Sequence, residues 1–249
     1  MKLHPVEVIS RERYGDHVRI QYLWTGDPPQ PGQFVMVRAA GHGLDPFLSR
    51  PLFAHDYEEG DVASLLVVVR GRGTALLAEE GSALLVSDPL GRGFQVTEDG
   101  PVALVGGGVW VSPLKLLARS LRRRGIEHDV YLESPAAASG AYLGFLKENF
   151  PGATLIETAG GTGSAVFLDW VGDLARYESI YVSGTAETLA AARSAAAGVV
   201  PAQLAVRERM ACANGSCYGC AVPVWAGGEM VYARACVDGP VFEAAALAW

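Results

Sequence analysis

Short apolar runs separated by glycine- and proline-rich turns dominate the first hundred residues of the chain. Valine, leucine and aromatic side chains concentrate in four of these runs, at residues 17–24, 34–38, 63–70 and 83–87. Short strands at this density, broken by turn residues, are typical of a small antiparallel barrel. The pattern therefore predicts an all-β domain over residues 1–98.

From residue 99 onward the pattern changes, and short apolar strands alternate with longer helical stretches. The predicted strands cover residues 102–105, 128–132, 154–157 and 180–183. The predicted helices cover residues 112–124, 141–149 and 186–197. Such alternation favours a parallel sheet with helices on its faces, so we expect a Rossmann-like α/β domain over residues 99–205.

The last segment, residues 206–249, contains a predicted hairpin. Two apolar strands, 221–225 and 230–233, flank Gly227 and Gly228, a pair that suits a tight hairpin turn. This hairpin would return the chain to the loop that precedes it.

All four cysteines of the chain lie in this last segment. Cys212, Cys217 and Cys220 are spaced C-x4-C-x2-C, and Cys236 follows after the hairpin. This is the plant-type spacing for a [2Fe–2S] cluster with a distant fourth thiolate. The loop also has the small residues that a chain wrapped around a cluster needs: Ala211, Ala213, Gly215, Ser216 and Gly219. We expect a [2Fe–2S] module here, with a four-thiolate zinc site or disulfides as the alternatives.

Composition excludes several other classes of protein. A net charge of −7 over 249 residues and a pI near 5.3 argue against nucleic acid as the main partner. No apolar run is long enough to cross a membrane. The start of the chain lacks a signal-peptide pattern, and we expect a cytoplasmic protein that keeps its cysteines reduced or on metal.

Several motifs together resemble those of a known family. They are PGQFV at 31–35, RPLF at 50–53, GRGT at 71–74, PLGRGF at 89–94, the cysteine loop at 210–220 and CVDGPVF at 236–242. Over nearly its whole length the chain resembles the dihydroorotate dehydrogenase electron transfer subunits of the ferredoxin-reductase superfamily. Subunits of sulfide dehydrogenases and of ferredoxin-linked transhydrogenases share much of the pattern. The resemblance implies a ferredoxin-reductase-like FAD barrel, a Rossmann-like nucleotide domain and a small C-terminal [2Fe–2S] module.

The resemblance also implies where the cofactors bind. The cluster ligands would be Cys212, Cys217, Cys220 and Cys236. FAD would contact Arg50, Pro51, Leu52, Phe53, Val67, Val68, Gly73 and Thr74. Arg50 offers a guanidinium fork to the pyrophosphate, and Gly73 with Thr74 would open a helix over residues 75–80 whose N–H groups face the same anion. Val67 and Val68 would bond the flavin through backbone groups.

Two residues depart from the family pattern. Phe53 stands where a hydroxyl residue is usual, and its ring cannot hydrogen-bond a flavin. Gly106, Gly107 and Gly108 match the glycine-rich turn expected to bind NAD, but Trp110 replaces the next glycine. The segments 157–163 and 183–185 match their family motifs weakly. NAD binding is therefore implied but left open.

The expected function is electron transfer in pyrimidine biosynthesis. Electrons would pass from an FMN-containing dihydroorotate dehydrogenase catalytic subunit through the [2Fe–2S] cluster and FAD to NAD+, in a heterotetramer of two copies of each subunit. The alternatives are a subunit of another NAD(P)H-linked oxidoreductase, a redox relay without a working NAD site, and a zinc-stabilised interaction module. Apolar residues 222–225 and 241–249 are expected either in the partner interface or in the core.

Overall fold

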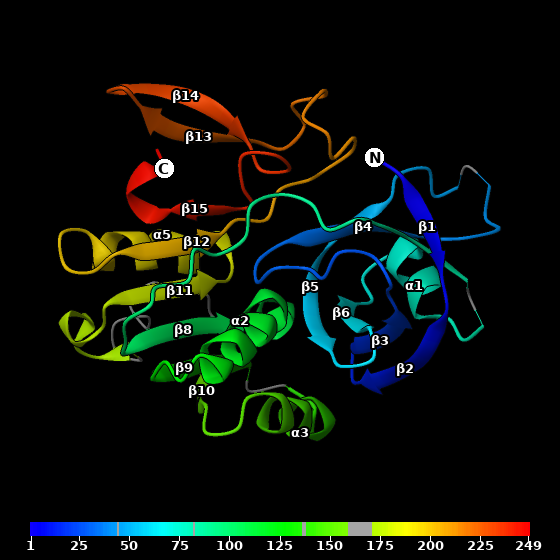
Figure 1. Cartoon of the computed structure of the whole chain (residues 1–249), viewed down its shortest axis with the longest axis horizontal. Coiled ribbons are helices and arrows are strands. Elements are labelled where there is room, and N and C mark those ends of the chain that lie inside the picture. Colours follow the sequence, from blue (N-terminus) through cyan, green and yellow to red (C-terminus); the bar gives the residue numbers. More distant parts are fainter. Residues whose placement is uncertain (44, 82, 136–137, 159–170) are drawn as a thin grey trace.

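The computed structural model describes residues 1–43, 45–81, 83–135, 138–158 and 171–249, and consists of two sheets side by side with the cysteine segment beside them (Figure 1). The first sheet contains seven strands: β1 (Leu3–Val6), β2 (Val8–Tyr14), β3 (His17–Leu23), β4 (Phe34–Ala39), β5 (Arg50–Glu58), β6 (Val62–Val68) and β7 (Leu84–Ser87). Their order is β1-β7-β4-β5-β6-β3-β2. Because the two outermost strands, β1 and β2, follow each other directly in the chain, the sheet closes into a barrel.

Apolar side chains from alternate strand positions fill the barrel. Ile20, Val37, Leu65 and Val86 are all fully buried there. Helix α1 (Arg72–Ala78) adds Leu77 to the same core. The helix begins at Arg72, so Gly73 and Thr74 lie in its first turn. The expectation of a helix over residues 75–80 that these two residues open is therefore wrong by about one turn.

The second sheet is of the α/β type. Its strands are β8 (Val102–Gly107), β9 (His128–Pro135), β10 (Thr154–Thr158), β11 (Ser179–Ser183), β12 (Ala202–Ala205) and β15 (Val241–Glu243), in the order β10-β9-β8-β11-β12-β15. The first five are parallel, and β15 pairs with β12 in the antiparallel direction. Strand β15 comes from the cysteine segment, so that segment is fastened into the α/β sheet.

Strand β8 shows why the sheet is covered on both faces. Val102 and Leu104 point to one face, Ala103 and Val105 to the other, and all four are fully buried. The described helices and short 3-10 turns around the sheet are η1 (Gly108–Val111), α2 (Ser112–Arg123), α3 (Gly140–Asn149), η2 (Leu174–Arg176), α5 (Ala186–Ala196) and η3 (Ala244–Ala246). Helices α2 and α3 pack in the core on the Leu104 face, and α5 packs on the Ala103 face.

Glycines bring three of the sequence motifs into contact. A side chain at Gly91 would lie 2.6 Å from the carbonyl oxygen of Gly239, and one at Gly32 would lie 2.8 Å from Val241. Both residues also have positive φ angles, 75° and 86°, which favour glycine. Arg92 donates its backbone N–H to Gly239. The motifs at 31–35, 89–94 and 236–242 therefore form the joint between the barrel and the cysteine segment.

The fold agrees with the main sequence predictions. The barrel, the α/β sheet and the hairpin are all present, the hairpin as β13 (Ala221–Ala226) and β14 (Glu229–Arg234) with positive φ at both turn glycines. Strands β1, β2, β5 and β15 were not predicted as strands. Residues 159–163 of the weakly matching NAD motif lie outside the described residues. Within the described part of the chain, no helix is both long and apolar enough to cross a bilayer.

Candidate functional site

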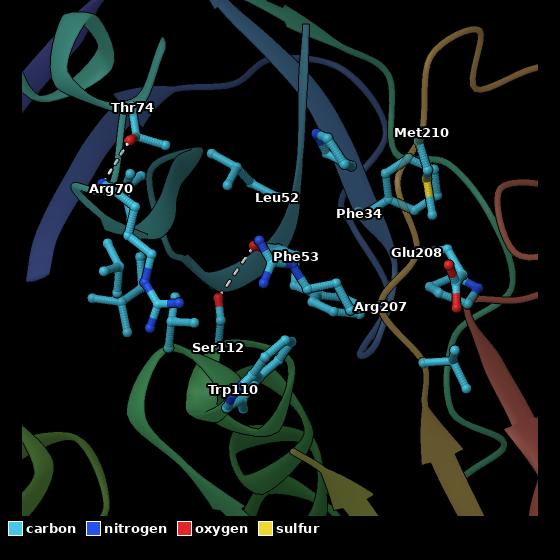
Figure 2. A pocket seen from close by; sticks show the side chains of 17 residues that line it. Phe34, Leu52, Phe53, Arg70, Thr74, Trp110, Ser112, Arg207, Glu208 and Met210 are labelled. Carbon is cyan, nitrogen blue, oxygen red and sulfur yellow. Dashed lines mark hydrogen bonds between the residues drawn. The ribbon is translucent and has the colours of Figure 1, made fainter. Parts of the chain in front are cut away.

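A cavity opens where the barrel, the α/β sheet and the start of the cysteine segment meet. It encloses about 830 Å³ of space, part of it open to solvent. Strands β4, β5 and β6 form one wall, the turn after β8 forms the floor, and residues 206–210 form the side (Figure 2). All three parts of the chain therefore contribute to the same site.

The barrel wall of the cavity is apolar. Pro51, Leu52, Phe53, Val67 and Val68 all line it, as expected for residues of a flavin site. The backbone carbonyl of Phe53 accepts a hydrogen bond of 3.2 Å from the Ser112 hydroxyl, which links β5 to the start of α2 (Figure 2). This wall suits a flat aromatic ligand, because ligand pockets combine apolar walls with few polar groups.

Two cations and one ring shape the rest of the cavity. Trp110 is half-buried on the floor, and the guanidinium carbon of Arg207 lies 5.0 Å from the centre of its ring. Burial and the nearby charge of Arg70 lower the pKa of Arg207. Arg70 also lines the cavity, and its backbone N–H donates to the Thr74 hydroxyl over 3.0 Å. The two guanidinium groups would attract an anionic ligand.

Arg50 and Gly73 lie together, but beside the main cavity rather than in it. They line a separate, much smaller hollow with Arg38. A side chain at Gly73 would overlap the Arg50 guanidinium, so the absence of a Cβ lets the arginine pass over α1. Arg50 also donates to the carbonyl of Leu48. Thr74, the residue after Gly73, lines the main cavity instead.

Gly106 and Gly107, the last residues of β8, and Gly108, the first of η1, do not line the main cavity. A side chain at Gly106 would lie 2.7 Å from Leu114, and one at Gly107 would lie 2.6 Å from Glu133. Gly108 has a φ of 52°, and its carbonyl accepts a hydrogen bond from Tyr142. Contacts with the protein itself therefore account for glycine at the first two positions, and backbone conformation accounts for it at the third.

The four cysteine thiols form two neighbouring pairs. The side chain of Cys217 is close enough to Cys212 to influence its pKa, and the side chain of Cys220 is close enough to influence that of Cys236. Ala213, Gly215 and Tyr218 have positive φ angles, which turn the loop sharply. None of the four cysteines forms a disulfide. Among the residues that the structure describes, no three His, Cys, Asp or Glu side chains are grouped to hold a single metal ion. The paired thiols match two irons with two thiolates each better than one zinc ion.

The two pairs lie in different electrostatic environments. Backbone N–H groups, that of Asn214 first and then that of Cys217, lower the pKa of Cys212 to about 6. Burial and the neighbouring Cys220 raise the pKa of Cys236 to about 11. Metal binding requires the thiolate form. The more exposed pair, Cys212 and Cys217, therefore includes a thiol that ionises readily. The buried pair, Cys220 and Cys236, needs the positive charge of a metal ion to ionise.

Arg234 and Asp238 brace the cysteine loop. Asp238 accepts hydrogen bonds from the backbone N–H of Arg234 over 2.8 Å and from its Nε over 3.1 Å. The Arg234 guanidinium carbon also lies 5.5 Å from the centre of the Tyr218 ring. Asp238 therefore closes the turn that contains Cys236, a usual role for an aspartate.

Sequence reasoning missed part of the cavity lining. Arg70, Ser112, Arg207 and Met210 all contribute to it and were not predicted as site residues. Arg70 directly precedes the GRGT motif, and Arg207 lies three residues before Met210 and the cysteine loop. Their position beside sequence motifs is the signal from which these two arginines could have been predicted as site residues.

Comparison with known proteins agrees with this architecture. Residues 207–248 match the model of the iron-sulfur cluster binding domain of dihydroorotate dehydrogenase B. Among solved structures, the NADH-dependent reduced ferredoxin-NADP oxidoreductase has a TM-score of 0.76 at 24% identity, over 98% of this chain and 90% of that one. Phthalate dioxygenase reductase, a modular structure for electron transfer from pyridine nucleotides to [2Fe–2S], has a TM-score of 0.64 at 16% identity, over 90% and 87%. These likenesses confirm the ferredoxin-reductase-like fold.

Curated relatives match over nearly the full length. The dihydroorotate dehydrogenase B (NAD(+)) electron transfer subunit of Caldanaerobacter subterraneus subsp. tengcongensis is 32% identical over 95% of both chains. The protein of the same name from Geobacillus kaustophilus is 35% identical over 86% of this chain and 85% of its own. The chain therefore belongs to the family of dihydroorotate dehydrogenase B (NAD(+)) electron transfer subunits.

Proposed function

We propose that this chain carries FAD and one [2Fe–2S] cluster and passes electrons between a dihydroorotate dehydrogenase catalytic subunit and NAD+. The family membership supports the reaction, and the cavity between barrel, α/β sheet and cysteine segment supports the cofactors. When bound, the cluster carries single electrons, and the flavin exchanges both single electrons and hydride.

The residues of the chain have separate roles in this proposal. Cys212, Cys217, Cys220 and Cys236 hold the cluster. Leu52, Phe53, Val67 and Val68 form the apolar wall for the flavin ring, and Arg50, Arg70 and Thr74 surround the phosphates at its far end. Gly106 and Gly107 end strand β8, and Gly108 begins the turn η1 that leads to the cavity residues Val109 and Trp110.

The observation that carries the proposal is the position of residues 206–210. This short segment leaves the α/β sheet at β12, lines the cavity through Val206, Arg207 and Met210, and leads directly to Cys212. The cavity and the cysteine loop are thus joined by a few residues of continuous chain. Two redox groups at these places would be close enough to exchange electrons.

The hairpin β13–β14 supplies a face for the catalytic subunit. Its inward residues Val222 and Val224 are buried in the core. The outward face of such a hairpin is normally polar, but here its exposed residues are Trp225, Met230 and Tyr232. Residues 222–225 and 241–249 were expected either in the partner interface or in the core, and both segments contain buried and exposed positions. Val222, Val224, Val241, Phe242, Ala244 and Leu247 are buried, while Trp225 and Trp249 are exposed.

We extend the proposal to this face. Large aromatic side chains in a contiguous apolar patch mark protein interaction sites. The patch follows the cysteine loop in the chain, and Tyr218 of that loop is also 55% exposed. An FMN-containing catalytic subunit that docks here would lie near the cluster, and two copies of each subunit would form the heterotetramer.

The test is anaerobic reconstitution of the chain with iron, sulfide and FAD. We expect FAD equimolar with the chain, and twice that amount of iron and of acid-labile sulfide, with visible bands that dithionite bleaches. The C212S variant should lose the iron and sulfide but keep the FAD. Zinc in place of iron, with no bound flavin, would contradict the proposal and favour an interaction module.

A further inference from the structure

Trp110 is the one large side chain that the turn after β8 sends into the described part of the cofactor cavity. Its neighbours in the cavity are Val109 and Ser112 from the same part of the chain, and Phe53 from the barrel wall opposite. The indole therefore lies between the apolar flavin wall and the α/β sheet (Figure 2). A nucleotide bound at the carboxyl ends of the α/β strands would approach the flavin wall beside this ring.

Arg207 holds the ring in this position. Its guanidinium carbon lies 5.0 Å from the ring centre, within the range of a cation–π contact. The negative face of the indole ring attracts the cation electrostatically. Arg207 is an exposed residue, although desolvation is the main cause that lowers the pKa of its guanidinium. Arg207 belongs to the segment that leads to the cysteines, so the ring is held between two parts of the chain.

The indole ring of Trp110 is not packed into the hydrophobic core. Its backbone lies in the short turn η1, between β8 and α2, whereas the neighbouring Val111 is fully buried. Trp110 itself is only half-buried. A half-buried ring held by a single cation can leave its position without unfolding the sheet below it.

We propose that Trp110 is a gate that limits nicotinamide access to the flavin, and that Arg207 is the positioning residue that keeps it closed. The inference rests on the proposed function, because it requires FAD in the cavity. If the inference is correct, the Trp110 ring does not limit single-electron exchange between the flavin and the cluster. Hydride exchange between the flavin and NADH requires the ring to move. Trp110 thereby sets the specificity of the flavin for its electron partner.

The test compares four variants of the reconstituted holoprotein. W110A removes the ring, W110F keeps a smaller ring, and R207Q removes the cation but keeps a long polar side chain. R209Q is the matched control, because Arg209 is an exposed arginine two residues away that does not line the cavity. Flavin bleaching by NADH is followed by anaerobic stopped flow, and NAD+ binding to the oxidised protein is measured by equilibrium dialysis.

We expect W110A to bleach at least ten times faster with NADH and to bind NAD+ at least tenfold more tightly than the wild type. R207Q should increase both the bleaching rate with NADH and the NAD+ affinity about threefold. W110F should give increases between those of R207Q and W110A, and R209Q should give none. Rates and affinities are expressed per FAD bound by each variant, and R209Q should match the wild type in dithionite bleaching and in FAD content. Unchanged or weaker NAD+ binding in both W110A and R207Q would overturn the gate.

Failure of the gate and failure of the proposed function give different results. If the wild type binds no FAD, the proposed function fails. If the wild type binds FAD and only W110A loses it, the gate is tested by comparing the NAD+ affinities of R207Q and W110F with that of R209Q. Gains in NAD+ affinity in those two variants support the gate, and wild-type values refute it.

Discussion

Replacing Trp225 on the outward face of the hairpin tests the docking surface directly. The residue is 51% exposed. A tryptophan buries up to about 250 Å² when covered, so a partner would remove roughly 125 Å² of this side chain from water. At about 25 cal/mol per Å² the contribution is about 3 kcal/mol, or about a hundredfold in affinity.

The variant is W225T, because threonine is β-branched and therefore suits a strand. Trp225 lies opposite Met230 in the hairpin register, and the backbone pairing of β13 with β14 does not depend on the indole. We expect the unfolding free energy to change by less than about 0.5 kcal/mol, as for other exposed positions. The affinity for the purified catalytic subunit should fall about a hundredfold, measured by biolayer interferometry.

The matched control is F47T. Phe47 is 67% exposed and lies in the loop before β5, in the barrel rather than the hairpin. Its replacement should leave affinity unchanged. The reasoning is refuted if folded W225T, with its full iron content, binds the catalytic subunit within threefold of the wild type. Equal losses in W225T and F47T would point to a non-specific effect of surface hydrophobicity.

Three further predictions concern the cluster and the joint between the sheets. C236S should leave less than a tenth of the wild-type iron after gel filtration and keep the FAD; full iron retention would remove Cys236 from the ligand set. Burial, and after it the charge of Lys115, lower the pKa of His55 from 6.5 to about 3 in the folded protein. As the pH falls below about 6.5, the unfolded chain therefore binds a proton that the folded protein does not. The free energy of unfolding then decreases by up to about 1.4 kcal/mol per pH unit. The H55L variant should therefore show a flatter melting-temperature profile between pH 7 and pH 4.5, and parallel profiles would contradict this. R119M leaves the buried carboxylate of Asp56 with the Lys115 cation, 4.0 Å away, and the backbone N–H of Tyr57. The unfolding free energy in urea should fall by about 2 kcal/mol, less than for a fully buried pair without a second cation. A loss below about 0.5 kcal/mol would show that the Arg119 contact contributes little.

The cysteine spacing and the hairpin were predictable because both are local. The C-x4-C-x2-C spacing and the pair Gly227-Gly228 each specify a turn within a few residues, and the structure has both. The alternation of strands and helices likewise predicted the α/β sheet, because its central strands β8, β11 and β12 are buried on both faces and read as short apolar runs.

The limits of the sequence lay in contacts between distant segments. Nothing in residues 241–243 indicates that they pair with β12, since three apolar and acidic positions suit many environments. The glycines at 106 and 107 match a nucleotide motif, yet it is Leu114 and Glu133 that come too close for a side chain. The pairing of Trp110 with Arg207 joins residues almost a hundred positions apart, and no local pattern indicates it.

The return of the chain through β15 has a mechanical consequence. The cysteine segment leaves the α/β sheet at the end of β12 and re-enters it at β15, the adjacent strand, where Ala205 pairs with Val241. Both ends of this excursion, Val206 and Pro240, line the cofactor cavity. A module tethered at two neighbouring points cannot swing like an arm on a single linker. The spacing between cluster and flavin is thus built into the sheet, and their electron exchange should not depend on the viscosity of the solvent.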